Sequence, residues 1–191
     1  ACYNGCMFDF IDGRFTQASS PEGTLVIRSP ADTADVVAQV PWARAQVDAA
    51  VEAARRAFRG WRRTPPSERA ALLRRYQAAL KAHADELALC ISREIGKPLW
   101  ESKTEVASMV TKVDLTLTEG DALVKDVSLA DLPGEIRHRP LGVVSVVGPF
   151  NFPGHLPNGQ IVPALLRGNC VVFKPSDKGP TTAALMARCF E

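Results

Sequence analysis

The chain has 191 residues, of which 46% are apolar and 23% are charged, and its formal net charge is only +2. This composition is typical of a soluble globular protein, and so weak a charge does not suggest a nucleic acid or an acidic membrane as a partner. No apolar run approaches the roughly 20 residues that a membrane-spanning helix needs, and no secretion-signal pattern opens the sequence. We therefore expect a cytoplasmic protein.

Short apolar runs separated by turn signals open the chain and predict strands. Residues 11–15, with the sequence Ile-Asp-Gly-Arg-Phe, predict a hairpin that turns at Asp12-Gly13. Residues 24–27 and 36–40 predict two further strands.

Apolar residues recur at three- and four-residue spacing from about residue 47 onward, which predicts a run of helices. The first helix is expected to end near Gly60. Pro65 and Pro66 separate it from the second helix, for which Ser67 is the expected N-cap. Five basic residues lie on or just beyond the first helix, away from its apolar face, and are expected to form a solvated surface: Arg55, Arg56, Arg59, Arg62 and Arg63.

Two further apolar stripes predict two more helices before residue 120. The first stripe is closed by Gly96, with Pro98 shortly beyond it, as is common at a helix C-terminus. The second predicts a helix over about 100–117, in which Ser102 and Glu105 stand at the spacing of a capping box.

The pattern changes after Gly120. Residues 123–139 alternate in character around a Pro133-Gly134 turn, which predicts an extended excursion. Residues 143–147 form a nearly continuous apolar run, typical of a strand buried on both faces of a parallel sheet.

The rest of the chain completes an alternating pattern. A helix is predicted over 160–166, a second buried strand over 170–173, and a last helix from about Thr181. Strand and helix alternating at this spacing predict the α/β class, as the opening of a doubly wound sheet. Two strands cannot complete such a sheet, so we expect an incomplete domain that exposes an apolar strand edge and aggregates.

The five cysteines are too few and too scattered for a disulfide framework. Cys2 and Cys6 would make half of a metal site, but no second pair follows at a suitable spacing, so no metal is expected. Cys90, Cys170 and Cys189 stand in apolar contexts that favour small core residues. Free thiols in a reducing cytosol are the expected state.

Ligands of open parallel sheets bind beyond the carboxyl ends of the strands. There the first loop carries Asn151, whose amide suits an oxyanion, and the second carries Lys174 and Asp177, which could hold the hydroxyls of a ribose. A turn asparagine and a surface ion pair are the plainer interpretations, and the residues alone favour them. The chain has no G-x-G-x-x-G, phosphate-loop or G-x-S-x-G motif.

Around these loops the sequence resembles the aldehyde dehydrogenase superfamily. The stretch 139–180, RPLGVVSVVGPFNFPGHLPNGQIVPALLRGNCVVFKPSDKGP, is similar to the family's Pro-Leu-Gly-Val strand and to its Pro-x-Asn-Phe-Pro, Pro-Ala-Leu-x-x-Gly-Asn and Lys-Pro-Ser-Glu segments. The stretch 93–106, REIGKPLWESKTEV, is similar to its Glu-x-Gly-Lys-Pro segment, and IDGRF to its N-terminal strands. Joint matches at these spacings, over nearly the whole chain, are highly specific.

Within the family, GHLPNGQIVPALL, RHRPLG and GKPLWES are similar to the branch that oxidises N-succinylglutamate 5-semialdehyde in arginine catabolism. Another aldehyde dehydrogenase with a different semialdehyde, using NAD or NADP, is the nearest alternative. A non-catalytic binding module of the same fold is an alternative of another class.

The resemblance implies a mechanism in which a cysteine thiolate attacks the aldehyde, NAD takes the hydride, and a glutamate activates water. Asn151 matches the family's oxyanion donor. Lys174 and Asp177 match the lysine and the glutamate that bind the adenosine ribose, which favours NAD over NADP; the shorter aspartate puts that preference in question. The implied cofactor contacts are Gly148, Pro149, Phe150, Lys174, Ser176 and Asp177.

The resemblance also implies what the chain lacks. The family's nucleophile and base lie beyond residue 191, so the chain by itself is expected to be inactive, and the complete enzyme to be a homo-oligomer. The implied organisation is a hairpin and helical part over 7–120, an excursion toward the oligomerisation domain over 121–140, and the first βαβα of a Rossmann-like sheet over 141–191, with the catalytic domain absent.

Overall fold

The computed structural model describes residues 9–131 and 133–191, and Cys2 and Cys6 lie outside them. Four strands form two antiparallel hairpins at its start: β1 (Asp9–Ile11) with β2 (Arg14–Thr16), and β3 (Gly23–Arg28) with β4 (Val36–Trp42). Asp12 and Gly13 have φ angles of 55° and 75°, the left-handed region that a tight two-residue hairpin turn requires. The predicted hairpin and the two further predicted strands are confirmed.

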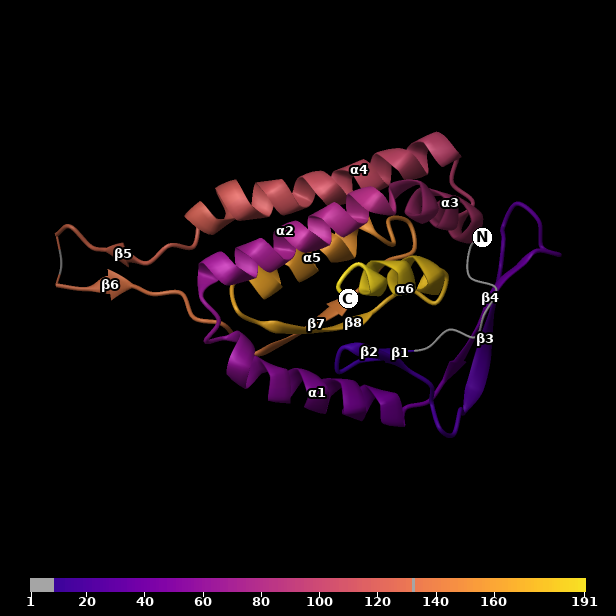
Figure 1. The fold of residues 1–191 in the computed structure, drawn as a ribbon, viewed down its shortest axis with the longest axis horizontal. Coiled ribbons are helices and arrows are strands. Elements are labelled where there is room, and N and C mark those ends of the chain that lie inside the picture. Colours follow the sequence, from indigo (N-terminus) through magenta and orange to yellow (C-terminus); the bar gives the residue numbers. More distant parts are fainter. Residues whose placement is uncertain (1–8, 132) are drawn as a thin grey trace.

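Four helices follow in the order that the apolar stripes predict (Figure 1). They are α1 (Ala45–Trp61), α2 (Pro66–Ala82), α3 (Ala84–Ile95) and α4 (Leu99–Leu115), which continues into a π-helical turn, η1 (Thr116–Gly120). The inward residues of α2, α3 and α4 are fully buried in one core: Leu80, Leu87, Ile91, Met109 and Val113. Apolar burial of this kind stabilises helices that would be marginal by themselves.

Two predicted helix caps are wrong. Pro65 is the N-cap of α2, and Pro66 occupies the first helical position, where a residue without an N–H costs nothing; Ser67 is therefore already inside the helix. Pro98 is likewise the N-cap of α4, so Ser102 is an interior buried residue and Glu105 makes its contacts with other elements. In both cases a proline already supplies the helix start.

Residues 123–131 and 133–139 form the extended excursion that the sequence predicts. Strands β5 (Val127–Ser128) and β6 (Glu135–Ile136) pair antiparallel in an arm that extends away from the rest of the molecule (Figure 1). Apolar side chains on this segment are exposed, with Leu123 at 82%.

The last four elements make a β-α-β-α unit: β7 (Val143–Val147), α5 (His155–Leu166), β8 (Cys170–Lys174) and α6 (Pro180–Arg188). The two strands are parallel, and their register runs from Val143 opposite Cys170 to Val147 opposite Lys174. This unit confirms the predicted α/β class. Helix α5 begins at His155, five residues before the predicted start.

The prediction that β7 is buried on both faces is wrong for this chain. Val146 is fully buried in the main core, and Val144 and Phe173 pack beside it. Ser145 and Val147 project to the opposite face and are exposed, Val147 at 64%. Helix α1 packs mainly along β8, so it leaves this part of the second face uncovered. Among the described residues, no helix is long and apolar enough to cross a membrane.

Candidate active site

The two loops that follow the parallel strands lie side by side. Gly148, the first residue after β7, donates its N–H to the carbonyl of Lys174 at 2.9 Å, so the loops diverge from adjacent points. A Cβ on Gly179 would lie 2.9 Å from Cβ of Pro153, so the loops also touch farther along. The structure therefore brings the predicted loop residues to one edge of the strand pair, as parallel strands require.

Asn151 is exposed on the first of these loops, and within the described part of the chain its side chain makes no hydrogen bond. Its amide is thus not used as a local turn contact, which was the plainer interpretation of the sequence. The neighbouring Phe150 is 55% exposed, and Nζ of Lys178 lies 5.6 Å from the centre of its ring. Asn151 keeps both amide hydrogens available for another molecule.

The charged groups of the second loop make only local hydrogen bonds. Nζ of Lys174 donates to the carbonyl of Pro175 at 2.7 Å and retains two further donors. Asp177 is exposed, and its carboxylate accepts from Oγ of Ser176 at 3.2 Å. Over the described ranges Lys174 and Asp177 form no ion pair with each other, so the surface pair that the sequence alone favoured is not present.

Gly148 must be a glycine for reasons of space. A Cβ at this position would lie 2.9 Å from Cε2 of Phe173 and 3.0 Å from Cγ of Pro157. The backbone therefore passes directly over the core, and Pro149, half-buried, keeps the chain extended as it leaves the strand.

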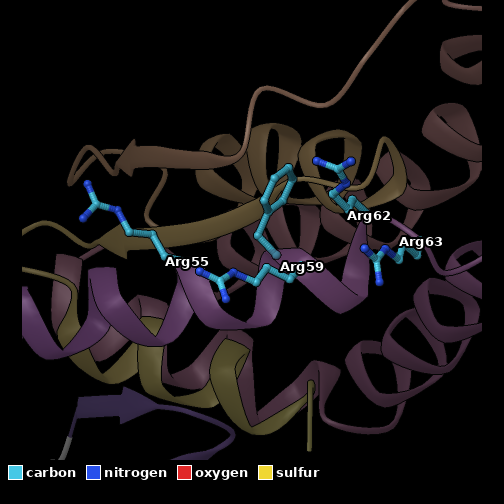
Figure 2. A pocket seen from close by; sticks show the side chains of 5 residues that line it. Arg55, Arg59, Arg62 and Arg63 are labelled. Atoms are coloured by element: carbon cyan, nitrogen blue, oxygen red, sulfur yellow. The ribbon is translucent and has the colours of Figure 1, made fainter.

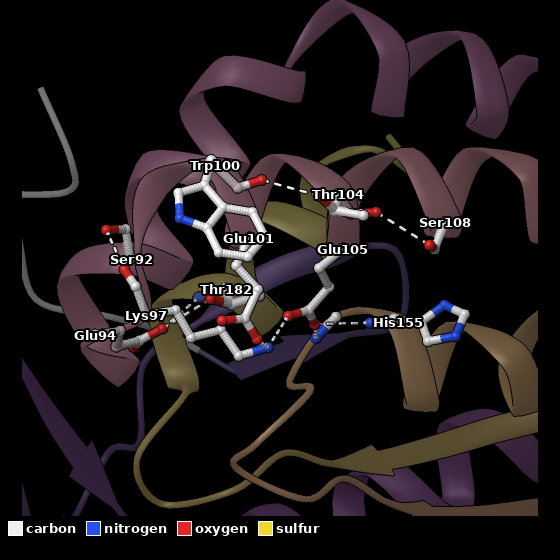
Figure 3. A network of polar contacts seen from close by, with 11 residues as sticks. Ser92, Glu94, Lys97, Trp100, Glu101, Thr104, Glu105, Ser108, His155 and Thr182 are labelled. Atoms are coloured by element: carbon white, nitrogen blue, oxygen red, sulfur yellow. Dashed lines mark hydrogen bonds and ion pairs between the residues drawn. The ribbon is translucent and has the colours of Figure 1, made fainter.

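A buried carboxylate on α4 holds the start of α5 (Figure 3). Oε1 of Glu105 accepts the N–H groups of Gly154 and His155 at 3.0 and 3.1 Å, and its Oε2 lies 2.7 Å from Nζ of Lys97. The Lys97 ammonium also lies 3.8 Å from the ring centre of Phe152, the residue after Asn151. This cap explains why α5 begins at His155, because a carboxylate 50 residues earlier binds its free N–H groups.

A second buried carboxylate holds the start of α6. Glu94 on α3 is 2% exposed and accepts from both the backbone N–H and the hydroxyl of Thr181 and of Thr182. Burial raises the pKa of Glu94 above its usual range, while these hydrogen bonds act in the opposite direction. Helix α4 thus caps α5 through Glu105, and α3 caps α6 through Glu94. Each capped helix follows one of the two loops. Sequence analysis missed both contacts, although the stretch 93–106 contains both glutamates.

The basic cluster on α1 is separate from these loops. Phe58 and four arginines line a hollow of about 430 Å³ (Figure 2): Arg55, Arg59, Arg62 and Arg63. The four arginines are exposed, as the sequence predicts, and Arg55 pairs with Glu52 at 2.9 Å.

The described cysteines are buried residues, as predicted. They are Cys90, Cys170 and Cys189. Burial raises the pKa of Cys170, and raises that of Cys189 to about 11. Because the thiolate is the nucleophile, neither is suited to attack a substrate at neutral pH. Among the described residues, no three His, Cys, Asp or Glu side chains gather as a metal ion would require.

Comparison with known proteins agrees with this arrangement. The model of the aldehyde dehydrogenase family matches residues 15–191. The chain belongs to this family. It is 52% identical over 170 residues to N-succinylglutamate 5-semialdehyde dehydrogenase of Ectopseudomonas mendocina, a match that covers 85% of the chain and 35% of that relative. The chain therefore spans about a third of the length of this curated aldehyde dehydrogenase.

Solved aldehyde dehydrogenase structures share the fold of the whole described chain. The 1-pyrroline-5-carboxylate dehydrogenase of Thermus with bound NAD has a TM-score of 0.88 and 27% identity, over 97% of this chain and 36% of that one. The NADP-dependent glyceraldehyde-3-phosphate dehydrogenase of Bacillus halodurans C-125, complexed with NADP, has a TM-score of 0.87 and 25% identity, over 98% and 40%. The α/β fold is thus the N-terminal part of the aldehyde dehydrogenase fold.

Proposed function

We propose that the protein acts as an aldehyde dehydrogenase that oxidises N-succinylglutamate 5-semialdehyde to N-succinylglutamate in arginine catabolism, with NAD as its cofactor. The observation that carries the proposal is that the two loops lie side by side and expose Asn151, Lys174 and Asp177. Within the described residues, these three side chains form no hydrogen bond or ion pair with one another. The similarity to a relative of that name supports the substrate.

The loop residues suit a nicotinamide dinucleotide. The Lys174 ammonium and the Asp177 carboxylate offer a donor and an acceptor to the two hydroxyls of the adenosine ribose. A carboxylate there would repel a 2′-phosphate, which favours NAD over NADP. Gly148, Pro149, Phe150 and Ser176 complete the proposed contacts. The bound nicotinamide supplies the hydride acceptor.

Asn151 is proposed to donate its amide N–H to the aldehyde oxygen, which becomes negatively charged when a nucleophile adds to the carbonyl. Removing one such donor costs about 10²–10³-fold in kcat. The nucleophilic cysteine and the general base are proposed to come from residues outside 1–191, because the three described cysteines are buried. Residues 1–191 by themselves are accordingly proposed to be inactive.

The complete enzyme is proposed to contain a cofactor-binding domain and an oligomerisation domain. Residues 7–120 and 141–191 would belong to the cofactor-binding domain, and 121–140 would lead into an oligomerisation domain. The exposed apolar side chains of Leu123, Val127 and Ile136 support assembly as a homo-oligomer. The proposed location is the cytoplasm.

The experiment is a steady-state assay of the complete enzyme against a panel of aldehydes, followed at the absorbance of NADH. N-succinylglutamate 5-semialdehyde should give the highest kcat/KM, ahead of glutamate 5-semialdehyde, succinate semialdehyde and propanal. A clear preference for propanal would refute the substrate, and equal rates with NADP would refute the cofactor. Aldehyde-dependent NADH formation by residues 1–191 alone would refute their proposed inactivity.

A further inference from the structure

Lys97 lies beside the carboxylates of Glu101 and Glu105 (Figure 3). Its side chain is 10% exposed, and its ammonium is 2.7 Å from Oε2 of Glu105, whose side chain is fully buried. The same ammonium is 3.8 Å from the ring centre of Phe152 and 3.7 Å from Oε1 of Glu101. Such close, shielded contacts are much stronger than those of a surface ion pair.

These contacts hold both ends of the short segment that follows Asn151. Phe152, covalently next to Asn151, rests on the Lys97 ammonium, and Gly154 is held through its N–H by Glu105. The segment has little room to shift, because a Cβ on Gly154 would lie 2.6 Å from Sδ of Met109.

The backbone of Lys97 is itself fixed. Its carbonyl accepts from Oγ of Ser92 at 2.7 Å, and Gly96, at φ 81°, ends α3 in the left-handed conformation just before it. The ammonium is therefore presented to the loop from the rigid junction between α3 and α4.

We propose that Lys97 is a positioning residue for the oxyanion donor, acting through Phe152 and Glu105 to hold Asn151 in its productive orientation. The inference rests on the proposed function of Asn151 but concerns a residue that touches neither substrate nor cofactor. A displacement of about 1 Å at a catalytic group can cost about 10²-fold in rate, so a support of this kind is sufficient to control kcat.

The test compares Lys97→Met with a matched control, Lys103→Met, in the complete enzyme. Lys103 lies on α4, shortly after Lys97 in the chain, and its ammonium forms a surface pair with Asp85 at 3.0 Å, with side chains 56% and 90% exposed. For Lys97→Met we expect kcat to fall about 10- to 100-fold with the KM for NAD within about twofold, because only the reacting centre is displaced. The control should keep kcat within about twofold.

Hydrogen exchange of the free enzyme supplies a readout that does not depend on catalysis. In Lys97→Met the amides of Asn151, Phe152, Gly154 and His155 should exchange about tenfold faster, while the α2 amides stay unchanged. Asn151→Ala should lower kcat without altering the exchange of this segment. If Asn151→Ala leaves kcat intact, the oxyanion role fails; unchanged exchange in Lys97→Met overturns the positioning role regardless.

Phe152→Leu covers the case in which Lys97→Met does not fold, because it removes the ring and keeps the buried ion pair and the cap. We expect faster exchange over Asn151–Gly154 and a kcat about three- to tenfold lower, in line with the strength of a shielded cation–π contact. Wild-type exchange and kcat in Phe152→Leu would overturn the proposed path through the ring.

Discussion

Replacing Glu94 with alanine should be among the most damaging single changes in the described chain. Its carboxylate is 2% exposed and accepts four hydrogen bonds from two residues at the start of α6. Thr181 and Thr182 are themselves 1% and 0% exposed, so water cannot replace the lost acceptor without opening the core. The variant therefore leaves buried donors unpaired as well as removing a helix cap.

The magnitude follows from those donors. The two hydroxyls can rotate toward other acceptors, but the two backbone N–H groups cannot, and each unpaired buried group costs about 1–3 kcal/mol. We expect Glu94→Ala to lower the free energy of unfolding by about 3 kcal/mol, out of the roughly 5–15 kcal/mol typical of a domain. Glu94→Gln keeps one acceptor oxygen but turns an NH₂ toward donors, so its cost should be about 1–2 kcal/mol.

The assay is urea unfolding followed by circular dichroism, with Glu52→Ala as the control. Glu52 is a surface glutamate of α1 whose side chain is 58% exposed, and its replacement should change stability by no more than about 0.5 kcal/mol. A loss of less than about 1 kcal/mol in Glu94→Ala, at an unchanged dependence on urea, would show that Glu94 does not hold the start of α6.

Three further predictions concern other contacts. Tyr76→Phe leaves the buried Asn158 oxygen without its 2.9 Å partner and should cost about 1–3 kcal/mol in urea unfolding; no loss would contradict the contact. The hydrogen bond from Arg93 holds the pKa of Asp35 below its usual value, so the stability it adds is present above about pH 4 and lost as pH falls through the lowered pKa. Asp35→Asn should therefore destabilise the chain at pH 7 and not at pH 2, and an equal effect at both would refute the assignment. Gly179→Ala should force apart the loops that follow β7 and β8, and so weaken the binding of NAD to the complete enzyme, measured by calorimetry. An unaltered affinity would count against a site shared by the two loops.

Local patterns were sufficient to predict the elements that local residues determine. The Asp12-Gly13 turn requires left-handed φ angles that few residue pairs adopt, and the apolar stripes through Leu80, Ile91 and Val113 are buried together in one core. The proximity of the loops after β7 and β8 was predictable, because adjacent parallel strands end at the same edge.

Contacts between distant residues were not predictable in the same way. The start of α5 depends on Glu105, 50 residues earlier. The first residues of the helix, 155–159, carry no local signal for a helix start. The spacing of Ser102 and Glu105 even predicted a different partner for this glutamate, since the sequence does not reveal that Pro98 already begins α4. Val147 is apolar yet exposed, because covering its face depends on which helices reach it.

A crystal structure of the complete enzyme with NAD would test the central claim most directly. Lys174 and Asp177 should lie within hydrogen-bond distance of the adenosine ribose hydroxyls, with the nicotinamide directed toward the loop that carries Asn151. A dinucleotide bound away from the edge formed by β7 and β8, or a ribose that contacts neither residue, would contradict the account.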